Sequence, residues 1–317
     1  MEAASVPDAQ VAPQAPRGQQ DNGVTDRAKS ERKLAYMLCA PAVIAMLLVT
    51  GYPIGYAFYL SLQKFDLRFP DEKEFVGFQN YVDVLTSSTW WSDVGTTAII
   101  TVASVSIELV LGMAIALVMH RAIFGRGAVR ASVLIPYGIV TVVAAFGWRY
   151  AFDPTSGFVQ GLPLISDTWA PFNERGSSLL VIILTEVWKT TPFMALLLLA
   201  GLALVPDELH EAAKVDGANA FQRFFRITLP LMRPAILVAL LFRTLDAFRV
   251  FDTVFIQTAG ANGTETVSIL GYNVLINRVN LGLGSAVSIL IFIAVILIAT
   301  FFVKVLGTST AQQRGEV

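Results

Sequence analysis

The chain has 317 residues, of which 55% are apolar and 15% are charged, and its formal net charge is −1. Its mean hydropathy of +0.61 is far above that of a soluble globular domain and predicts a membrane protein. Two histidines and one cysteine exclude an intrachain disulfide and argue against a usual transition-metal site. The sequence contains no G-x-x-x-x-G-K-[ST] loop for ATP, so we do not expect an enzyme that hydrolyses ATP by itself.

Apolar residues gather in six segments, each of about the 20 residues that a helix needs to cross a hydrocarbon core. We therefore expect an all-α, polytopic fold with six transmembrane helices, in a membrane domain that covers residues 34–306. The expected spans are residues 34–60, 94–120, 131–152, 177–205, 234–257 and 285–306.

The basic residues predict how these spans are oriented. Most of the 23 lysines and arginines lie before the first span, in the second and fourth connections, or after the last span. Because cytoplasmic loops carry an excess of basic residues, we expect both termini and the fourth connection in the cytoplasm. Residues 1–33, rich in Ala, Pro, Gln and Asp, are predicted to form a disordered tail, and residues 307–317 a second cytoplasmic tail.

The fourth connection, residues 206–233, is polar and compatible with helix. Its opening Pro-Asp-Glu sequence predicts a helix start, because acids in a first turn favour the positive end of the helix dipole. Gly217 predicts a turn or a close backbone approach, and a second short helix is expected to end at Leu229-Pro230. The segment alone is also compatible with a plain amphipathic loop on the membrane surface.

Charged side chains within the expected spans cost about 2.5–3.5 kcal/mol each on insertion scales, so they need partners or water. Arg243 and Asp252 could form internal ion pairs or line a polar cavity, and Glu108 is expected to reach a hydrogen-bond partner on another helix without a role in transport. The residues expected to line a cavity for a polar substrate are Glu186, Lys189, Asp246 and Arg249.

The fourth connection carries a long motif that resembles the coupling loop of ABC-importer permeases, which reads E-A-A, then a glycine, then I-x-L-P. The matching residues are Glu211, Ala212, Ala213, Asp216, Gly217, Ala218, Ile227, Leu229 and Pro230. By this resemblance the loop docks as a short helix into a cleft on a cytoplasmic ATPase. Glu211 would then be its polar contact with that ATPase, and Gly217 would permit the turn.

Residues 75–81, FVGFQNY, resemble the F-x-G-x-x-N-Y stretch that follows the first span in the sugar (maltose-type) branch of these permeases. Six spans with both ends inside also fit the type I importer fold of that branch. Residues 187–194 and 241–249 are most similar to permeases that import trehalose. The resemblance therefore implies a permease subunit of an ATP-driven importer for trehalose or a related disaccharide, which forms half of the translocation path.

The resemblance also implies which residues contact the sugar, because in the similar maltose-importing permease these contacts come from three core spans. The corresponding positions are Tyr137, Thr141, Glu186, Lys189, Thr190, Phe242, Asp246 and Arg249. Tyr137 could stack against the apolar face of a sugar ring or be an interfacial tyrosine beside Pro136. Several of these positions are charged where the maltose permease is neutral, which leaves the identity of the sugar open.

The expected partners are a second homologous permease subunit, two copies of a cytoplasmic ATPase that binds ATP and Mg, an extracytoplasmic sugar-binding lipoprotein, and membrane lipid. No cofactor, metal or nucleic acid is expected on this chain, which would be a non-catalytic subunit in the bacterial inner membrane. The alternatives are an importer of glycerol phosphate or another oligosaccharide, an ion-coupled secondary transporter that uses the intramembrane charges as a relay, and a membrane scaffold.

Overall fold

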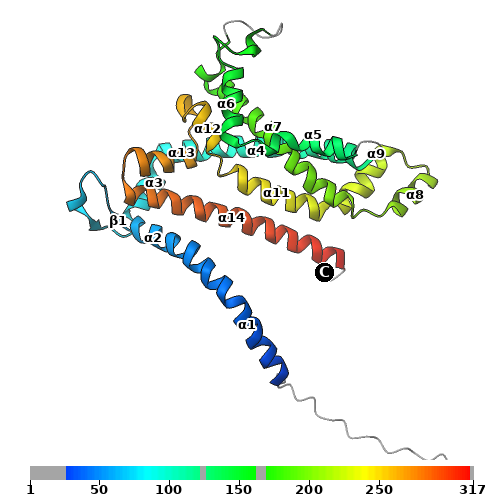
Figure 1. Cartoon of the computed structure of the whole chain (residues 1–317), viewed down its shortest axis with the longest axis horizontal. Helices are drawn as coiled ribbons and strands as arrows, with labels where there is room; N and C mark the ends of the chain where they lie inside the picture. Colours follow the sequence, from blue (N-terminus) through cyan, green and yellow to red (C-terminus); the bar gives the residue numbers. More distant parts are fainter. Residues whose placement is uncertain (1–25, 122–125, 162–168, 315–317) are drawn as a thin grey trace, which may run out of the picture. The chain divides into compact units, whose positions relative to one another are not determined.

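The computed structural model describes residues 26–121, 126–161 and 169–314. Residues 1–25 of the expected N-terminal tail and residues 315–317 of the expected C-terminal tail lie outside this part. The described chain is almost entirely helical (Figure 1), which confirms the expected all-α class. It divides into two units, residues 1–53 and 54–317.

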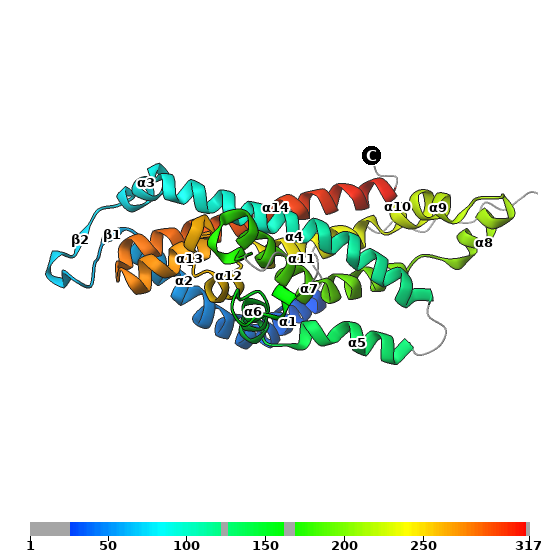
Figure 2. The ribbon, with the colours of Figure 1, turned by 90° about the horizontal axis from the view of Figure 1, so that it is seen from above.

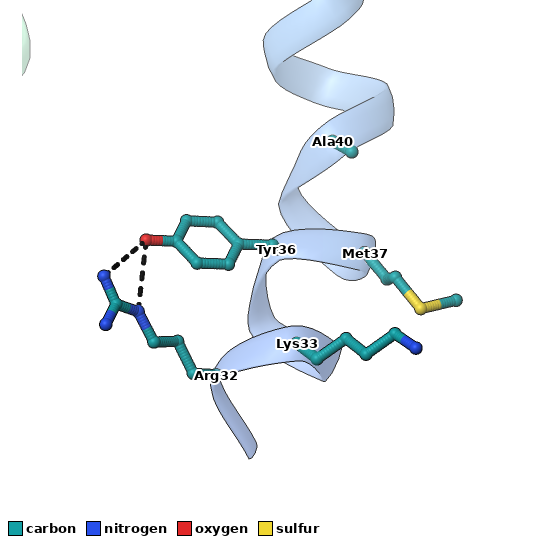
Figure 3. A pocket seen from close by; sticks show the side chains of 5 residues that line it. All are labelled: Arg32, Lys33, Tyr36, Met37 and Ala40. Carbon is teal, nitrogen blue, oxygen red and sulfur yellow. Dashed lines mark hydrogen bonds between the residues drawn. The ribbon is translucent and has the colours of Figure 1, made fainter. Parts of the chain in front are cut away.

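The first unit contains α1 (Asp26–Met46), a π-helical segment (Leu47–Gly51) and the start of α2 (Tyr52–Ser61). Segment 1–33 was expected to be disordered throughout, but the helix α1 begins within it, at Asp26. The first turns of α1 are built mostly from good helix formers, which explains this early start. Arg32 donates hydrogen bonds from Nε and Nη2 to Tyr36 Oη at 3.3 and 3.2 Å (Figure 3). The hollow drawn there is lined by one face of a single helix, so it does not enclose a ligand.

The second unit holds the remaining elements. Its strands are β1 (Gln63–Lys64) and β2 (Glu74–Phe75), and its helices are α3 (Gln79–Thr86), α4 (Ser88–Arg121), α5 (Arg126–Gly138), α6 (Thr141–Ala151), α7 (Arg175–Leu202), α8 (Asp207–Val215), α9 (Ala220–Arg223), α10 (Leu229–Leu231), α11 (Arg233–Ala247), α12 (Asp252–Gln257), α13 (Val267–Tyr272) and α14 (Leu281–Arg314). Short π-helical segments follow α9 at Phe224–Thr228 and α13 at Asn273–Asn277. The last helix, α14, extends into the expected tail at 307–317.

Four helices in the described part are long and apolar enough to cross a membrane. Two bent pairs bring the number of candidate spans to six if each pair counts as one span. The four are Glu31–Ser61, Ser88–His120, Arg175–Leu202 and Leu281–Val305, and the pairs are Ala131–Gly138 with Thr141–Ala151 and Ala220–Leu231 with Arg233–Ala247. Five of the expected apolar segments agree with these positions, whereas the span expected at 234–257 overlaps only Arg233–Ala247, the second member of the second pair.

The core of the second unit forms where α4, α7 and α11 pack side by side (Figures 1 and 2). Small residues allow this close approach, as is usual between membrane helices. A Cβ atom at Gly112 would lie 2.8 Å from Met194 Cγ, and one at Gly201 would lie 2.5 Å from Ala235 Cβ. Buried Met and Leu side chains fill the remaining space between the three helices.

Two of the expected spans are broken, which corrects the sequence-based interpretation. The segment expected as one span at 131–152 is the second part of α5 followed, after residues 139–140 and a 91° bend, by α6. The segment expected as one span at 234–257 is α11 followed, after an irregular stretch at 248–251, by α12. The short helix that was expected to end at Leu229-Pro230 continues to Leu231 and then bends by 67° into α11. A proline in the first turn of a helix loses no hydrogen bond, so Pro230 and Pro234 near two helix starts are compatible with this path.

The antiparallel pair β1–β2, with Gln63 opposite Phe75, was not expected. It is joined to the start of α14, because Gly282 donates its backbone N–H to Phe65 O at 3.0 Å. Arg68 Nε donates to Asp66 Oδ1 at 2.9 Å. This hydrogen bond, together with one from the backbone of Arg68, lowers the pKa of Asp66 to about 2.

Candidate functional site

A cavity of about 430 Å³ opens in the second unit where α5, α6, α7, α11 and α12 converge. This volume is within the range of roughly 300–1,000 Å³ typical of small-molecule sites. Its lining residues are Tyr137, Thr141, Glu186, Lys189, Thr190, Asp246, Arg249, Val250, Phe251, Asp252 and Thr253.

The broken helices build much of this lining. Thr141 begins α6 just beyond the 91° bend after α5, and residues 249–251 form the irregular connection between α11 and α12. Irregular backbone at membrane depth is tolerated only where it is buried in protein or faces a water-filled cavity, since lipid cannot satisfy its polar groups. Both breaks border the cavity, so their location favours a polar, hydrated site.

Two long-range hydrogen bonds hold the broken pieces in place. Arg149 Nη1 donates to Ile256 O at 2.6 Å and links α6 to α12. Gln257 Nε2 donates to Thr185 Oγ1 at 2.8 Å and links α12 to α7. The short helix α12, which carries Asp252 and Thr253 into the lining, is therefore fixed from two sides.

Seven of the eight residues singled out by the family resemblance lie together in this lining: Tyr137, Thr141, Glu186, Lys189, Thr190, Asp246 and Arg249. Phe242 is not among the lining residues, and its side chain on α11 is 54% exposed. Residues 250–253 were not assigned to the site, although Asp252 had been considered. Their contribution depends on the break after α11, which apolar periodicity does not indicate.

Behind the cavity wall, Arg243 is the centre of a buried charge cluster. Its Nε donates to Glu108 Oε2 at 2.5 Å, its Nη2 to Glu186 Oε2 at 3.2 Å, and its Nη1 to Asp246 Oδ2 at 2.6 Å. Thr190 Oγ1 donates to Glu108 Oε1 at 2.8 Å. Glu108 thus has partners on α7 and α11, as expected, and Arg243 forms internal ion pairs across three helices.

This cluster positions two of the acids that line the cavity. Glu186 receives a hydrogen bond from Arg243 on one carboxylate oxygen and from Thr253 Oγ1, at 2.5 Å, on the other. Asp246 is held by Arg243 while its side chain stays 66% exposed. The cavity wall therefore presents carboxylates whose orientation is fixed from inside the protein.

The cavity combines both signs of charge. Glu186, Asp246 and Asp252 supply carboxylates, and Lys189 and Arg249 supply cations. Such groups form charge-assisted hydrogen bonds with hydroxyls, which both donate and accept. The mixture favours a neutral polyhydroxy ligand over a strongly anionic one, because the three acids would repel the latter.

An aromatic surface borders the charged one. The ring of Tyr137 stacks on Phe193 with centroids 5.5 Å apart and an interplanar angle of 13°. Lys189 Nζ lies 5.7 Å from the centroid of the same ring, a distance compatible with a cation–π contact. Tyr137 thus packs within the protein while it lines the cavity, and it is 43% exposed.

The coupling-loop motif forms a helix–turn–helix with defined caps. After α8, Gly217 adopts a positive φ of +79°. Ala218 N donates to Ala213 O at 2.8 Å and Gly217 N donates to Lys214 O at 3.0 Å, which is the Schellman arrangement that ends many helices. A residue with a Cβ would be strained at this φ, so Gly217 has the role in the turn that the sequence predicted.

The next helix begins with a capping box. Gln222 N donates to Asn219 Oδ1 at 2.8 Å, and Asn219 N donates to Gln222 Oε1 at 2.9 Å. This reciprocal pair satisfies two backbone donors that a helix start leaves free. The turn between α8 and α9 is therefore specified by local hydrogen bonds on both sides.

The motif residues of α8 face outward. Glu211, Ala212, Asp216 and Gly217 are exposed and Ala213 is half-buried, and α8 has no fully buried residue. An exposed helix with two alanines beside an acid presents a surface of short side chains next to a negative charge. This geometry suits docking to another protein, because small side chains allow close approach.

Comparison with known proteins identifies the family of this chain. Residues 86–312 match the family described as "Binding-protein-dependent transport system inner membrane component". The chain is 53% identical, over 90% of its length and 92% of the relative, to the trehalose transport system permease protein SugA of Mycobacterium tuberculosis. It is 40% identical, over 90% of its length and 98% of the relative, to the trehalose/maltose transport system permease protein MalF of Thermococcus litoralis.

Among solved structures, a chain of a bacterial ABC transporter involved in import of the acidic polysaccharide alginate has a TM-score of 0.75 and 21% identity, with 89% of this chain and 98% of that one covered. That similarity shows the fold of an ABC-transporter membrane subunit. The family match and the identities of 53% and 40% also establish the family to which the chain belongs. The chain therefore belongs to the family of inner membrane components of binding-protein-dependent transport systems, and it is a permease protein of that family.

Proposed function

We propose that this chain is the permease subunit of an ATP-driven importer for trehalose or a related disaccharide, and that it forms half of the translocation path. The observation that carries the proposal is the mixed-charge cavity, which is lined by seven positions implied by the family resemblance. The two relatives described above are named for trehalose or for trehalose and maltose. A neutral disaccharide fits the balance of acids and bases in the lining.

The proposed mechanism uses the helical connection between the coupling loop and the cavity. From Ala220 the chain is helical through the π-helical segment and α10, bends at Met232, and continues as α11 to Ala247. Asp246 and Arg243 lie near the far end of α11. When ATP closes the ATPases, a push on Glu211 would move this connection and rock the spans, which would switch the side from which the cavity is open.

The proposed assembly contains a second homologous permease, two copies of a cytoplasmic ATPase that bind ATP and Mg, and an extracytoplasmic sugar-binding lipoprotein. In this assembly the Glu211 loop and both chain ends face the cytoplasm. Glu211, Ala212, Ala213, Asp216 and Gly217 would contact the ATPase, because they carry the motif and all except the half-buried Ala213 are exposed.

The test is uptake by the complete importer, reconstituted in vesicles with its native partners. Labelled trehalose, maltose and glycerol phosphate are offered in turn, and ATP consumption is followed in parallel. We expect trehalose or a related disaccharide to accumulate with ATP hydrolysis and to be insensitive to proton and sodium ionophores. Accumulation of glycerol phosphate instead, or uptake that collapses with an ion gradient and needs no ATP, would contradict the proposal.

A further inference from the structure

A second cavity, of about 610 Å³, lies at the end of the unit that carries the coupling loop. It opens between the last turns of α4 and α7, the helix α8 and the start of α9. None of its residues belongs to the substrate cavity. Its lining consists of Leu117, His120, Leu202, Val205, Asp207, His210, Lys214, Ala220, Phe221, Arg223, Phe224 and Thr228.

The polar part of this lining is rich in nitrogen donors. Both histidines of the chain, His120 and His210, face the cavity together with Lys214 and Arg223, whereas Asp207 is the one carboxylate among the lining side chains that the structure describes. The charged and titratable groups therefore favour an anion. They come from three elements, α4, α8 and α9, so an anion bound among them would touch all three.

The floor of the cavity adds a buried hydroxyl. The residue Thr228 is 4% exposed, and its Oγ1 lies 3.4 Å from His210 Nε2. The guanidinium of Arg223 is oriented by a hydrogen bond from Nη1 to Ala218 O at 2.5 Å. Lys214 is exposed on the next turn of α8 from His210, so its ammonium can reach the mouth of the cavity.

The rest of the lining is apolar, and it lies at the ends of two candidate spans. The candidate span of α4 ends at His120 and that of α7 ends at Leu202, so the cavity lies where two membrane helices leave the apolar layer. Leu117, Val205 and Phe224 extend the wall on the same side. Basic pockets between spans at this level are suited to phosphate groups, including those of lipid headgroups.

We propose that this cavity is a binding site for a phosphate-bearing ligand. The phosphate oxygens lie among Lys214, His120 and His210 and accept charge-assisted hydrogen bonds, and the remainder of the ligand contacts the apolar wall. A phosphate in this position ties α8 to the end of α4. The site does not depend on which sugar the importer carries, because its residues are separate from the substrate cavity.

The ligand's phosphate can come from an anionic phospholipid or from a soluble phosphate, and two arms distinguish these sources. In the first, the complete importer is purified from nanodiscs of phosphatidylcholine and phosphatidylglycerol, and phosphatidylglycerol retained per permease is counted by native mass spectrometry. In the second, the importer in phosphatidylcholine nanodiscs is dialysed against radiolabelled inorganic phosphate. The ATPases also bind phosphate, so only the bound radiolabelled phosphate that changes with the permease variants is assigned to this site.

The matched variants are Lys214→Gln and Arg226→Gln. Each removes one positive charge from the same connection, but Arg226 lines a neighbouring hollow and not this cavity. His120→Gln removes a second proposed phosphate contact, at a position on α4 and not on α8. Each variant is used only if it co-purifies with its partners and unfolds at the wild-type temperature, and His120→Gln keeps the test valid if Lys214→Gln fails this requirement.

We expect Lys214→Gln and His120→Gln to weaken retention of the phosphate-bearing probe by about tenfold, since each loses one charge-assisted hydrogen bond, whereas Arg226→Gln retains it. If phosphatidylglycerol follows this pattern the source is lipid, and if only inorganic phosphate follows it the source is soluble. The proposal is overturned if neither probe binds, or if all variants retain the probe like the wild type.

Discussion

Arg243 on α11 and Glu108 on α4 form a two-pronged buried ion pair. Nε of the arginine donates to Oε2 of the glutamate at 2.5 Å, and Nη2 donates to Oε1 at 3.0 Å. The side chains are 1% and 0% exposed. Because Arg243 also contacts Glu186 and Asp246, one guanidinium pairs with acids on three helices and connects helix packing to the cavity wall.

The first prediction concerns this pair. Arg243→Leu leaves Glu108 buried without a cation, and loss of one partner of a buried pair costs about 3–5 kcal/mol. We expect the variant importer to unfold at a clearly lower temperature in a thermal scan of the purified complex. The second substitution Glu108→Gln should recover part of this loss in the Arg243→Leu background, because it removes the uncompensated charge. Equal unfolding of Arg243→Leu and the wild type would contradict the structure at this point.

The second prediction separates the cavity from the helix surface. Lys189→Gln removes a cation that lines the cavity and lies over Tyr137, so ATP-dependent uptake of trehalose should fall about tenfold, as expected for one lost charged hydrogen bond. Phe242→Leu is the control, since Phe242 lies outside the lining, and its uptake should stay within about twofold of the wild type. The reverse order of the two effects would show that the substrate path runs along the other face of α11.

The third prediction tests the coupling helix. Glu211→Lys reverses the charge at the exposed centre of α8, and a surface that accommodates a carboxylate at this position would repel the lysine. We expect the variant permease to reach the membrane but to lose its ATPase during purification and to import no sugar. Asp71→Lys is the matched reversal, because Asp71 is also exposed but lies in the distant β1–β2 connection. If Glu211→Lys retains the ATPase as well as Asp71→Lys does, α8 is not the attachment point.

The fourth prediction concerns the turn after α8. In the described part of the chain no atom lies within 4 Å of a Cβ placed at Gly217, so Gly217→Ala introduces backbone strain at φ +79° without a clash. That strain costs about 1–2 kcal/mol, and hydrogen exchange at the amides of position 217 and Ala218 should accelerate about 5- to 30-fold relative to the wild type. Gly176→Ala is the control, since it meets no neighbour and has no positive φ. Unchanged exchange in Gly217→Ala would mean that the turn opens by another route.

Much of this architecture could be predicted from sequence because two of its signals are local. Apolar segments of sufficient length predict spans, and the α8 turn is encoded by a glycine and an Asn-x-x-Gln capping box. The breaks at 139–140 and 248–251 could not be predicted in the same way. Hydropathy reports how apolar a segment is, and both breaks lie within segments that remain apolar enough to be read as one span.

Some features of the candidate cavity could also be predicted from the sequence, and others could not. The four charges predicted to line it, at positions 186, 189, 246 and 249, do line it, because an intramembrane charge requires water or a partner. The central position of Arg243 could not be predicted, since two of its three partners, Glu186 and Glu108, lie 57 and 135 residues away in sequence. The expectation of one continuous helix at 234–257 also differs from the structure here, because α11 ends at Ala247 and Arg249 and Asp252 follow the break.

A cryo-electron microscopy structure of the complete importer would show directly whether this cavity holds sugar and whether α8 contacts an ATPase. Its ATPases would be held by a substitution that blocks ATP hydrolysis, and trehalose and the sugar-binding protein would be supplied. We predict density for one disaccharide between Tyr137, Lys189 and Asp246, with Glu211 seated on an ATPase. An empty cavity with sugar bound elsewhere in the membrane subunits, or a Glu211 helix without contact to an ATPase, would contradict it.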